Sequence, residues 1–201
     1  MEKSPARSKK RTAIYGGSFN PIHTGHTQLA QHIVAAGYVD ELWLLVSPLN
    51  PLKADSAANL LPDEVRLHLA RLATTGIKEL RVSDFEMRLP KPSFMVNTLA
   101  ALRKHYPRRQ FVLVIGADNW ACFDRWYHSE EILQRHEILV YPREGYPIDP
   151  TTLPPNVRLI QAPLFNTSSS EIRQSIAQGN YQGDWLAPKV WDEIKLHRYY
   201  R

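Results

Sequence analysis

Two histidines three residues apart follow a pair of glycines near the start of the sequence, in the segment GGSFNPIHTGH of residues 16–26. Glycines let the backbone approach a ligand closely, and a helix N-terminus beyond them offers unpaired N–H groups and partial positive charge to a phosphate. Imidazoles spaced i, i+3 lie on one side of the first helical turn, where each can donate a hydrogen bond to phosphate oxygens. We therefore expect a phosphate site that contains His23 and His26.

The same segment permits simpler explanations. Two glycines on their own often mark only a tight connection between a strand and a helix. A zinc site needs a third ligand, and the sequence from His26 to His32 contains no HExxH pattern. The segment also matches neither the P-loop pattern nor GxGxxG, so both of these nucleotide-binding fingerprints are absent. We expect no protein-bound metal ion.

Two later segments place polar side chains where elements begin or end. Asp118 follows an apolar run and Gly116, so its carboxylate stands at the end of a strand, where it could meet a ligand or only cap a helix. Ser168 and Glu171 have the spacing of a capping box, and Arg173 comes in the first turns of the helix that they open. A guanidinium and free backbone N–H groups could converge there on one phosphate. The alternative for Arg173 is an exposed arginine on the helix surface.

The elements that must position these side chains alternate along the chain. Apolar patterns predict strands over 12–15, 41–46, 80–85, 111–115, 137–141 and 157–161. Helical patterns begin near residues 24, 63, 93, 130, 168 and 188. Such alternation implies an α/β fold with a doubly wound parallel sheet, in which ligands bind at the carboxyl ends of strands where the strand order reverses. The proline-containing stretch 47–62 is expected to border that site.

Length and charge restrict the class of protein. The chain has 201 residues, of which 43% are hydrophobic and 22% charged, as suits one compact domain. Most of the formal net charge of +5 belongs to residues 1–11, so residues 12–201 are nearly neutral. We expect a basic flexible tail over 1–11, a single domain over 12–201 and no nucleic-acid partner. A nucleic-acid-binding module that uses the tail is the rival explanation from another class.

The sequence also bears on location. Its single cysteine, Cys122, cannot form an internal disulfide. We find no apolar run long enough to span a bilayer and no apolar stretch typical of a secretory signal. We expect a cytoplasmic protein with no membrane role, and the possibility of a homo-oligomer is left open.

The segment of residues 16–26 resembles the signature of the HxGH nucleotidyltransferase superfamily. From about residue 12 to 201, the chain resembles the bacterial nicotinate-nucleotide adenylyltransferase family. Further segments agree with that family in the same order: 50–53 (NPLK), 92–94 (PSF), 115–119 (IGADN), 123–126 (FDRW), 141–143 (YPR) and 168–173 (SSSEIR). The resemblance implies a Rossmann-like nucleotidyltransferase fold.

The resemblance assigns most of these residues to ATP. It implies that the phosphates are held by the two histidines and the serine-rich segment, that Lys53 reaches them from the loop, and that the guanidinium of Arg143 stacks on adenine. The residues expected to act in catalysis are His23, His26, Lys53 and Arg173. The full set expected to bind ATP is Gly16, Gly17, Ser18, Phe19, His23, His26, Gly116, Asp118, Arg143, Ser168, Ser169 and Arg173.

The resemblance assigns a second group to the acceptor, with the indole of Trp126 stacking on a pyridine ring. The expected acceptor-binding residues are Asn50, Lys53, Met95, Trp126 and Tyr127. The chain departs from the common family pattern at Met95, where threonine is frequent, and at Thr167, where isoleucine is frequent. If a hydroxyl is required at position 95, the choice of acceptor is in doubt; if backbone N–H groups suffice, methionine is harmless.

The reaction that the resemblance implies is adenylyl transfer from ATP to nicotinic acid mononucleotide, which yields nicotinic acid adenine dinucleotide and pyrophosphate in NAD biosynthesis. The acceptor phosphate attacks the α-phosphorus in line, so the protein has to position two anions and neutralise developing charge. Mg²⁺ would arrive with the ATP phosphates, since the sequence shows no carboxylate cage for it. Nicotinamide mononucleotide and phosphopantetheine are the nearest alternative acceptors, because the phosphate-binding parts are shared.

Overall fold

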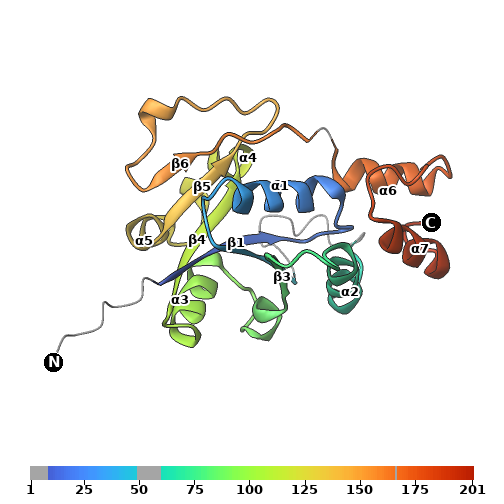
Figure 1. Cartoon of the computed structure of the whole chain (residues 1–201), viewed down its shortest axis with the longest axis horizontal. Helices are drawn as coiled ribbons and strands as arrows, with labels where there is room; N and C mark the ends of the chain where they lie inside the picture. Colours follow the sequence, from blue (N-terminus) through green and yellow to red (C-terminus); the bar gives the residue numbers. More distant parts are fainter. Residues whose placement is uncertain (1–8, 49–59, 166) are drawn as a thin grey trace.

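Six strands form one parallel sheet in a computed structural model that describes residues 9–48, 60–165 and 167–201. The strands are β1 (Lys10–Gly17), β2 (Glu41–Val46), β3 (Leu80–Ser83), β4 (Arg109–Gly116), β5 (Glu137–Tyr141) and β6 (Val157–Leu159). Their order across the sheet is β3-β2-β1-β4-β5-β6, and every neighbouring pair is parallel (Figure 1). This order confirms the doubly wound sheet that the alternating pattern predicts.

Seven helices and three short 3-10 segments are described around the sheet. The longer helices are α1 (Thr24–Ala35), α2 (Asp63–Ala73), α3 (Met95–His105), α5 (Ser129–Arg135), α6 (Ser169–Ala177) and α7 (Pro188–His197). The short elements are α4 (Ala117–Trp120), η2 (Phe85–Arg88), η3 (Phe123–Arg125) and η4 (Pro150–Thr152). Among the described residues, none of these helices has the length and apolar character needed to cross a membrane.

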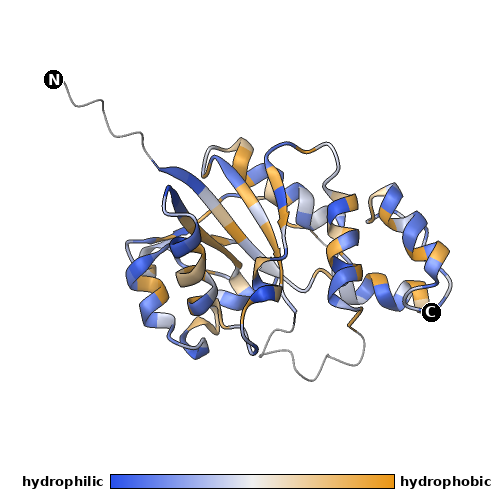
Figure 2. Cartoon of the chain, turned by 90° about the horizontal axis from the view of Figure 1, so that it is seen from below, coloured by the Kyte–Doolittle hydropathy of each residue, from blue (hydrophilic) through white to orange (hydrophobic). Residues whose placement is uncertain are grey.

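The sheet separates two hydrophobic layers. Successive residues of β1 alternate between them: Ala13 and Tyr15 belong to the layer with α1, α2, α6 and α7, while Ile14 belongs to the layer with α3 and α5. All six residues of β2 are buried, as expected for a strand covered on both faces. The hydrophobic stretches accordingly follow the strands and the inner sides of the helices (Figure 2).

The strand order reverses next to β1, which pairs with β2 on one side and β4 on the other. The chain passes from β2 and β3 back across to β4, so the connections after β1 and β4 leave on opposite sides of the sheet. Ligands bind at such a reversal, outside the carboxyl ends of the strands. Gly17 and Gly116 end β1 and β4 there, and α6 and α7 lie beyond the same edge (Figure 1).

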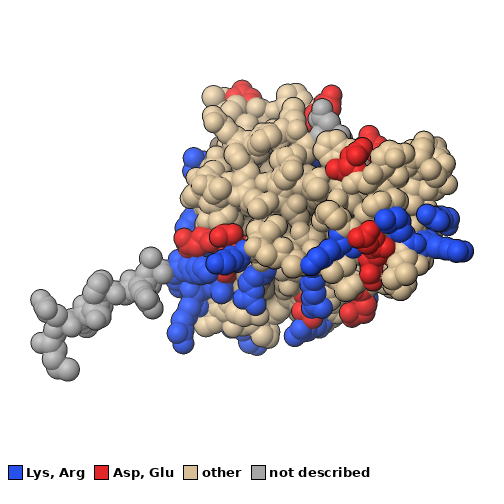
Figure 3. Space-filling view, turned by 45° about the vertical axis from the view of Figure 1, so that its right-hand side comes forward, with Lys and Arg blue, Asp and Glu red and all other residues tan. Residues whose placement is uncertain are grey.

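The first strand begins earlier than predicted, which corrects the boundary of the basic tail. Lys10 and Arg11, assigned above to the tail, are the first residues of β1. Lys10 Nζ lies 2.6 Å from a carboxylate oxygen of Glu41, and Arg11 Nη2 lies 2.9 Å from one of Glu137. These ion pairs keep two polar residues in the strand. Lys and Arg side chains gather around this start of β1 (Figure 3), whereas residues 1–8 lie outside the described residues.

Candidate active site

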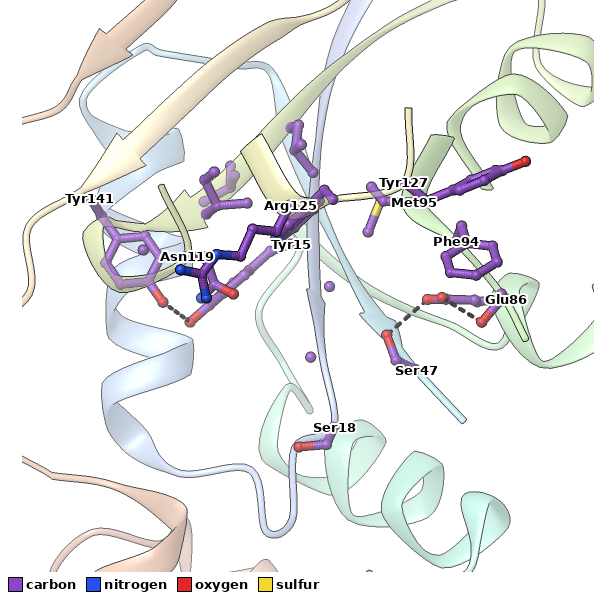
Figure 4. Close-up of a pocket in the computed structure, with 18 residues that line it drawn as sticks. Tyr15, Ser18, Ser47, Glu86, Phe94, Met95, Asn119, Arg125, Tyr127 and Tyr141 are labelled. Carbon is purple, nitrogen blue, oxygen red and sulfur yellow. Dashed lines mark hydrogen bonds between the residues drawn. The ribbon is translucent and has the colours of Figure 1, made fainter. Parts of the chain in front are cut away.

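Two cavities adjoin at the carboxyl edge of the sheet. The first, called the glycine-loop cavity, has a volume of about 360 Å³ (Figure 4). It is lined by Gly16, Gly17, Ser18, Ser47, Glu86, Met95, Gly116, Arg125, Trp126 and Tyr127, among others. The second, called the histidine cavity, has about 390 Å³ and is lined by His23, Gly25, His26, Asp118, Arg143, Thr167, Ser168 and Glu171, among others. Most of the residues predicted for a site therefore meet at one edge.

The glycine segment leaves room for the neighbouring side chain of Met95. A Cβ on Gly16 would lie 3.1 Å from the Met95 methyl carbon. A Cβ on Gly116 would lie 2.2 Å from a carboxylate oxygen of Asp118, so a larger residue would displace that carboxylate. At both glycines, neighbouring side chains therefore pack close to the backbone.

The turn after β1 is held by a buried arginine that sequence reasoning missed. Arg66, on α2, is fully buried and donates to the backbone carbonyls of Ser18 at 2.5 Å, Ser47 at 2.8 Å and Pro48 at 3.0 Å. It also pairs with the carboxylate of Asp63 at 2.6 Å. Arg66 thus ties the ends of β1 and β2 together at the mouth of the glycine-loop cavity.

The two histidines lie against each other at the start of α1. Their ring centroids are 3.7 Å apart, and the backbone N–H of His23 donates to Nδ1 of His26 at 3.2 Å. That bond makes Nδ1 the acceptor, so the neutral imidazole of His26 carries its hydrogen on Nε2. Burial, and then the positive charge of Arg143, lowers the pKa of His23 to about 4. His23 is therefore neutral at neutral pH.

Asp118 and Arg143 form the opposite wall of the histidine cavity. Arg143 Nε lies 3.6 Å from Oδ1 of Asp118, and its guanidinium lies over the ring of Tyr141, 5.4 Å from the centroid. The side chain of Arg143 is about one-third exposed, so one side of the guanidinium faces solvent. A planar cation held in this way offers a surface on which a flat aromatic group can stack.

The N-terminus of α6 is capped by its own carboxylate. The backbone N–H of Ser168 donates to Glu171 at 2.9 Å, and the N–H of Glu171 donates back to the Ser168 hydroxyl at 3.2 Å, which confirms the predicted capping box. Ser169 donates to the carbonyl of Pro21 at 2.9 Å, and Arg173 donates to that of Asn20 at 2.8 Å. Ser169 and Arg173 line neither cavity and instead fasten α6 to the turn before α1.

Aromatic side chains cover the far side of the glycine-loop cavity. Trp126 packs on Phe123 with ring centroids 5.3 Å apart, and Tyr127 packs on Phe94 at 4.5 Å. Phe94 carried no role in the sequence prediction, yet it forms this wall with Tyr127 (Figure 4). Arg125 lines the same cavity and adds a positive charge that the prediction also missed.

A buried carboxylate connects two elements at this cavity. Glu86 is 3% exposed and accepts hydrogen bonds from the hydroxyls of Ser47 and Ser93, each at 2.8 Å (Figure 4). Burial raises the pKa of Glu86, although the two hydroxyls oppose that change. The contact joins the end of β2 to the residues before α3. Nothing in the local sequence marks Glu86, because its partners are 39 and 7 residues away.

Some predicted residues fall elsewhere. Phe19, with a positive φ of 45°, is buried against Tyr15 and His26 and does not line either cavity. Gly16, Gly17, Ser18 and Gly116, predicted for ATP, line the glycine-loop cavity together with the residues predicted for the acceptor. Asn50 and Lys53 lie outside the described residues.

Comparisons with known proteins agree on one family. The cytidylyltransferase-like family model matches residues 14–175. A probable nicotinate-nucleotide adenylyltransferase of Bacteroides thetaiotaomicron is 48% identical over 188 residues, which are 94% of this chain and 92% of the relative. A relative of the same description from Flavobacterium johnsoniae is 38% identical over 95% of this chain and 99% of its own.

A solved structure has the same fold. The Plasmodium falciparum nicotinic acid mononucleotide adenylyltransferase, complexed with NaAD, aligns with a TM-score of 0.78 over 95% of this chain and 97% of its own. At 20% sequence identity, this likeness concerns the fold.

Proposed function

The chain belongs to the nicotinate-nucleotide adenylyltransferase family within the cytidylyltransferase-like proteins, and on this premise we propose that it transfers the adenylyl group of ATP to nicotinic acid mononucleotide. The products are nicotinic acid adenine dinucleotide and pyrophosphate. The histidine cavity would receive ATP, and the glycine-loop cavity would receive the acceptor. As a step in NAD biosynthesis, the reaction would take place in the cytoplasm.

The observation that carries the proposal is a set of buried polar atoms that make no hydrogen bond, although Oδ1 of Asp118 has an ion-pair contact with Arg143 at 3.6 Å. Within the part of the chain that the structure describes, the buried side-chain nitrogens and oxygens without a hydrogen bond are His23 Nδ1, Asp118 Oδ1 and Trp126 Nε1. Buried polar groups are nearly always hydrogen-bonded, so such atoms call for a ligand or ordered water. His23 and Asp118 line the histidine cavity, and Trp126 lines the glycine-loop cavity. The unsatisfied atoms thus lie in the two cavities that the proposed reaction needs.

The reaction itself needs positioning more than proton transfer. A phosphate oxygen of the acceptor is already ionised and forms a bond to the α-phosphorus, while the bond from that phosphorus to the bridging oxygen breaks and its electron pair leaves with pyrophosphate. The neutral imidazole of His23 and the Nε2–H of His26 would donate hydrogen bonds to phosphate oxygens without exchanging protons. Arg143 would stack on the adenine ring.

Mg²⁺ would enter as part of the substrate. Among the described residues, no three His, Cys, Asp or Glu side chains lie close enough together to hold a metal ion. The site's imidazoles, guanidinia and backbone N–H groups suit phosphate oxygens, and the carboxylates of Asp118 and Glu171 in the histidine cavity are engaged with Arg143 and with the start of α6. We therefore assign Mg²⁺ to the β- and γ-phosphates of ATP, where it would neutralise charge on the leaving group.

The glycine-loop cavity would favour an acidic acceptor over its amide. Met95 is the first residue of α3, where a backbone N–H precedes the intrahelical hydrogen bonds, and Nε1–H of Trp126, which has no hydrogen bond among the described residues, lies in the same cavity. A carboxylate accepts from all such donors, whereas the NH₂ of an amide would face them donor to donor. Each mismatch costs on the order of 1–3 kcal/mol, so two would give a preference of roughly a hundredfold or more in kcat/KM.

Pyrophosphate release with each mononucleotide tests the proposal. ATP, Mg²⁺ and nicotinic acid mononucleotide should give turnover, and the nicotinamide form should react with a kcat/KM roughly a hundredfold lower. His26→Ala, purified in parallel, should lose most of the activity, while His32→Ala, two turns further along α1, should retain it. No turnover with any pyridine mononucleotide would refute the function, and equal kcat/KM values for acid and amide would refute the assigned acceptor site.

A further inference from the structure

Two tyrosines stand where the glycine-loop cavity and the histidine cavity meet. Among the described residues, Tyr15 and Tyr141 are the only ones that line both cavities. They come from the carboxyl-terminal parts of β1 and β5, the two strands that flank β4 in the sheet. Their exposed fractions are 5% and 7%, and their hydroxyl oxygens point at each other across 3.3 Å (Figure 4).

The two hydroxyls carry one more proton than their mutual hydrogen bond requires. Burial raises the pKa of both tyrosines, and the neighbouring hydroxyl contributes further to that of Tyr15, so both hydroxyls stay protonated at neutral pH. Two hydroxyls bring two protons, but their mutual hydrogen bond uses only one. The second proton is buried at the junction of the cavities, where a ligand can accept it. The separation of 3.3 Å is also longer than the usual O–H···O distance of about 2.7–2.8 Å.

The position of this donor matches a definite point of the reaction. If ATP occupies the histidine cavity and the acceptor occupies the glycine-loop cavity, the phosphorus under attack has to lie where the two cavities meet. Each cavity also contains an arginine: Arg143 lines the histidine cavity, with its guanidinium over the ring of Tyr141, and Arg125 lines the glycine-loop cavity. The hydroxyls therefore lie where two cavities that each contain a cation meet.

We propose that the hydroxyls of Tyr15 and Tyr141 are catalytic groups that donate a hydrogen bond to a non-bridging oxygen of the α-phosphate during adenylyl transfer. The inference rests on the proposed function and adds residues to it. Both protons remain on the tyrosines throughout, because the new bond joins an acceptor oxygen to phosphorus and the leaving electron pair goes to pyrophosphate. The donated bond stabilises negative charge that builds on the non-bridging oxygen in the transition state.

Substitution of each tyrosine by phenylalanine removes the hydroxyl and keeps the ring. Tyr15→Phe and Tyr141→Phe should each lower kcat by on the order of tenfold to a hundredfold, because an oriented donor to a developing anion acts mainly in the transition state. The KM values for both substrates should change by less than about threefold, since little ground-state binding is lost. Tyr38→Phe is the matched control, because its hydroxyl accepts from the backbone N–H of Gln161 and lines neither cavity.

ATP analogues with sulfur at the α-phosphate distinguish a direct hydrogen bond from the tyrosines to that phosphate from a purely structural role of the tyrosines. In the two diastereomers of adenosine 5′-O-(1-thiotriphosphate), sulfur replaces one or the other non-bridging oxygen. If a hydroxyl donates to one of these oxygens, the parent should discriminate between the diastereomers, and the ratio of their kcat/KM values should move toward one in Tyr15→Phe and Tyr141→Phe. A purely structural role would leave this ratio unchanged, and thermal unfolding of each variant reports on structure independently.

The outcomes are distinct. A fall in kcat together with a changed diastereomer ratio in either folded variant supports the proposal. Variants with kcat within about twofold of the parent, or with an unchanged ratio despite slower turnover, overturn it. A parent that turns over normally, beside unaffected phenylalanine variants, leaves the proposed function standing and rejects only the tyrosine contact. A parent without turnover refutes both.

Discussion

The imidazole of His23 is buried, and this burial affects both its protonation and its availability to a ligand. It is 5% exposed, packs on His26 and has a buried Nδ1 without a hydrogen bond in the described part of the chain. A Cβ on Gly25 would lie 3.1 Å from its ring, so the glycine is what permits this packing. The arrangement keeps the imidazole neutral and holds a polar atom ready for a ligand, at a cost to the stability of the empty protein.

That cost should be visible as a dependence of stability on pH. Burial, with the charge of Arg143, lowers the pKa of His23 from 6.5 to about 4. Between these values the unfolded state binds a proton that the folded state does not, so the free energy of unfolding should fall as the pH drops from 7 to 4. The full effect is about 3 kcal/mol. Urea unfolding at pH 7, 5.5 and 4 should show this loss in the parent and a smaller one in His23→Gln.

His105→Gln controls for the loss of a histidine as such, because His105 is exposed on α3. His136 is also buried with a lowered pKa, and its contribution is present in the parent and in both variants. Parallel pH dependence in the parent and His23→Gln would show that folding does not lower the pKa of His23.

At the scale of elements, Arg66 lets one helix organise two strand ends. Its guanidinium reaches the carbonyls of Ser18, Ser47 and Pro48, and its Nε donates to the carbonyl of Leu61 at 2.9 Å. Burial lowers the pKa of Arg66, while Asp63 opposes the change. The hydrogen bonds from this buried cation stabilise one arrangement of the loops, because each carbonyl would lose its partner if the loops moved away.

Arg66→Lys should therefore destabilise the protein although it keeps the charge. One ammonium group cannot replace a planar fork that reaches carbonyls in three directions. We expect a loss of on the order of 3 kcal/mol in the free energy of unfolding, measured by urea titration. Arg71→Lys, at an exposed position of the same helix, is the matched control. A change within about 0.5 kcal/mol for Arg66→Lys would mean that the carbonyls find other partners.

The elements differ in how far sequence alone predicts them. The continuous apolar runs of β2 and β5 match the observed bounds, because strands buried on both faces need no polar residues. The start of β1 was missed because Lys10 and Arg11 are tolerated there only through carboxylates 31 and 126 residues away. In α2, Val65, Leu69 and Leu72 have the spacing of an apolar helix face, while the buried residues are Arg66, Leu67, Leu69 and Ala70. Because arginine is classed as a polar residue, a hydrophobic pattern leaves Arg66 out. The helix face that the pattern indicates is therefore rotated relative to the face that is buried.

The residues of the candidate site likewise differ in whether the sequence alone could identify them. The glycines, His23, His26 and the capping box of α6 stand close together in sequence, and a local pattern was enough to find them. Tyr15, Glu86 and Tyr141 looked like strand or helix residues, because their significance depends on contacts between distant segments. Ser93 was predicted to open a helix, but α3 begins at Met95 and the hydroxyl of Ser93 donates to Glu86 instead. Long-range hydrogen bonds decided each of these cases.

At the scale of the whole molecule, distant parts of the chain converge on Asn20 in the turn before α1. Its side-chain oxygen accepts from the backbone N–H of Leu61 at 3.2 Å and from the hydroxyl of Tyr200 at 2.8 Å. Its carbonyl accepts from Arg173 at 2.8 Å. The turn that leads to His23 is thus held by residues that precede α2, lie in α6 and follow α7.

Tyr200→Phe tests whether the end of the chain stabilises this turn. Burial raises the pKa of Tyr200, so its hydroxyl remains a donor at neutral pH. Loss of the bond to Asn20 should reduce the free energy of unfolding by about 1 kcal/mol, measured by urea titration. Tyr199→Phe, whose ring stacks on His197, should have a smaller effect. Equal stability of the parent and Tyr200→Phe would show that the bond from Tyr200 to Asn20 does not stabilise the turn.

The bond between Tyr200 and Asn20 also matters for handling the protein. A purification tag or fused reporter joined directly after Arg201 would begin next to Tyr200, and so next to the turn that leads to His23 and His26. The described chain starts at Lys9, just before β1, at the end of the sheet opposite α6 and α7 (Figure 1). A fusion placed ahead of that point leaves the site untouched, so activity measured on C-terminally tagged protein should be compared with an N-terminally tagged preparation.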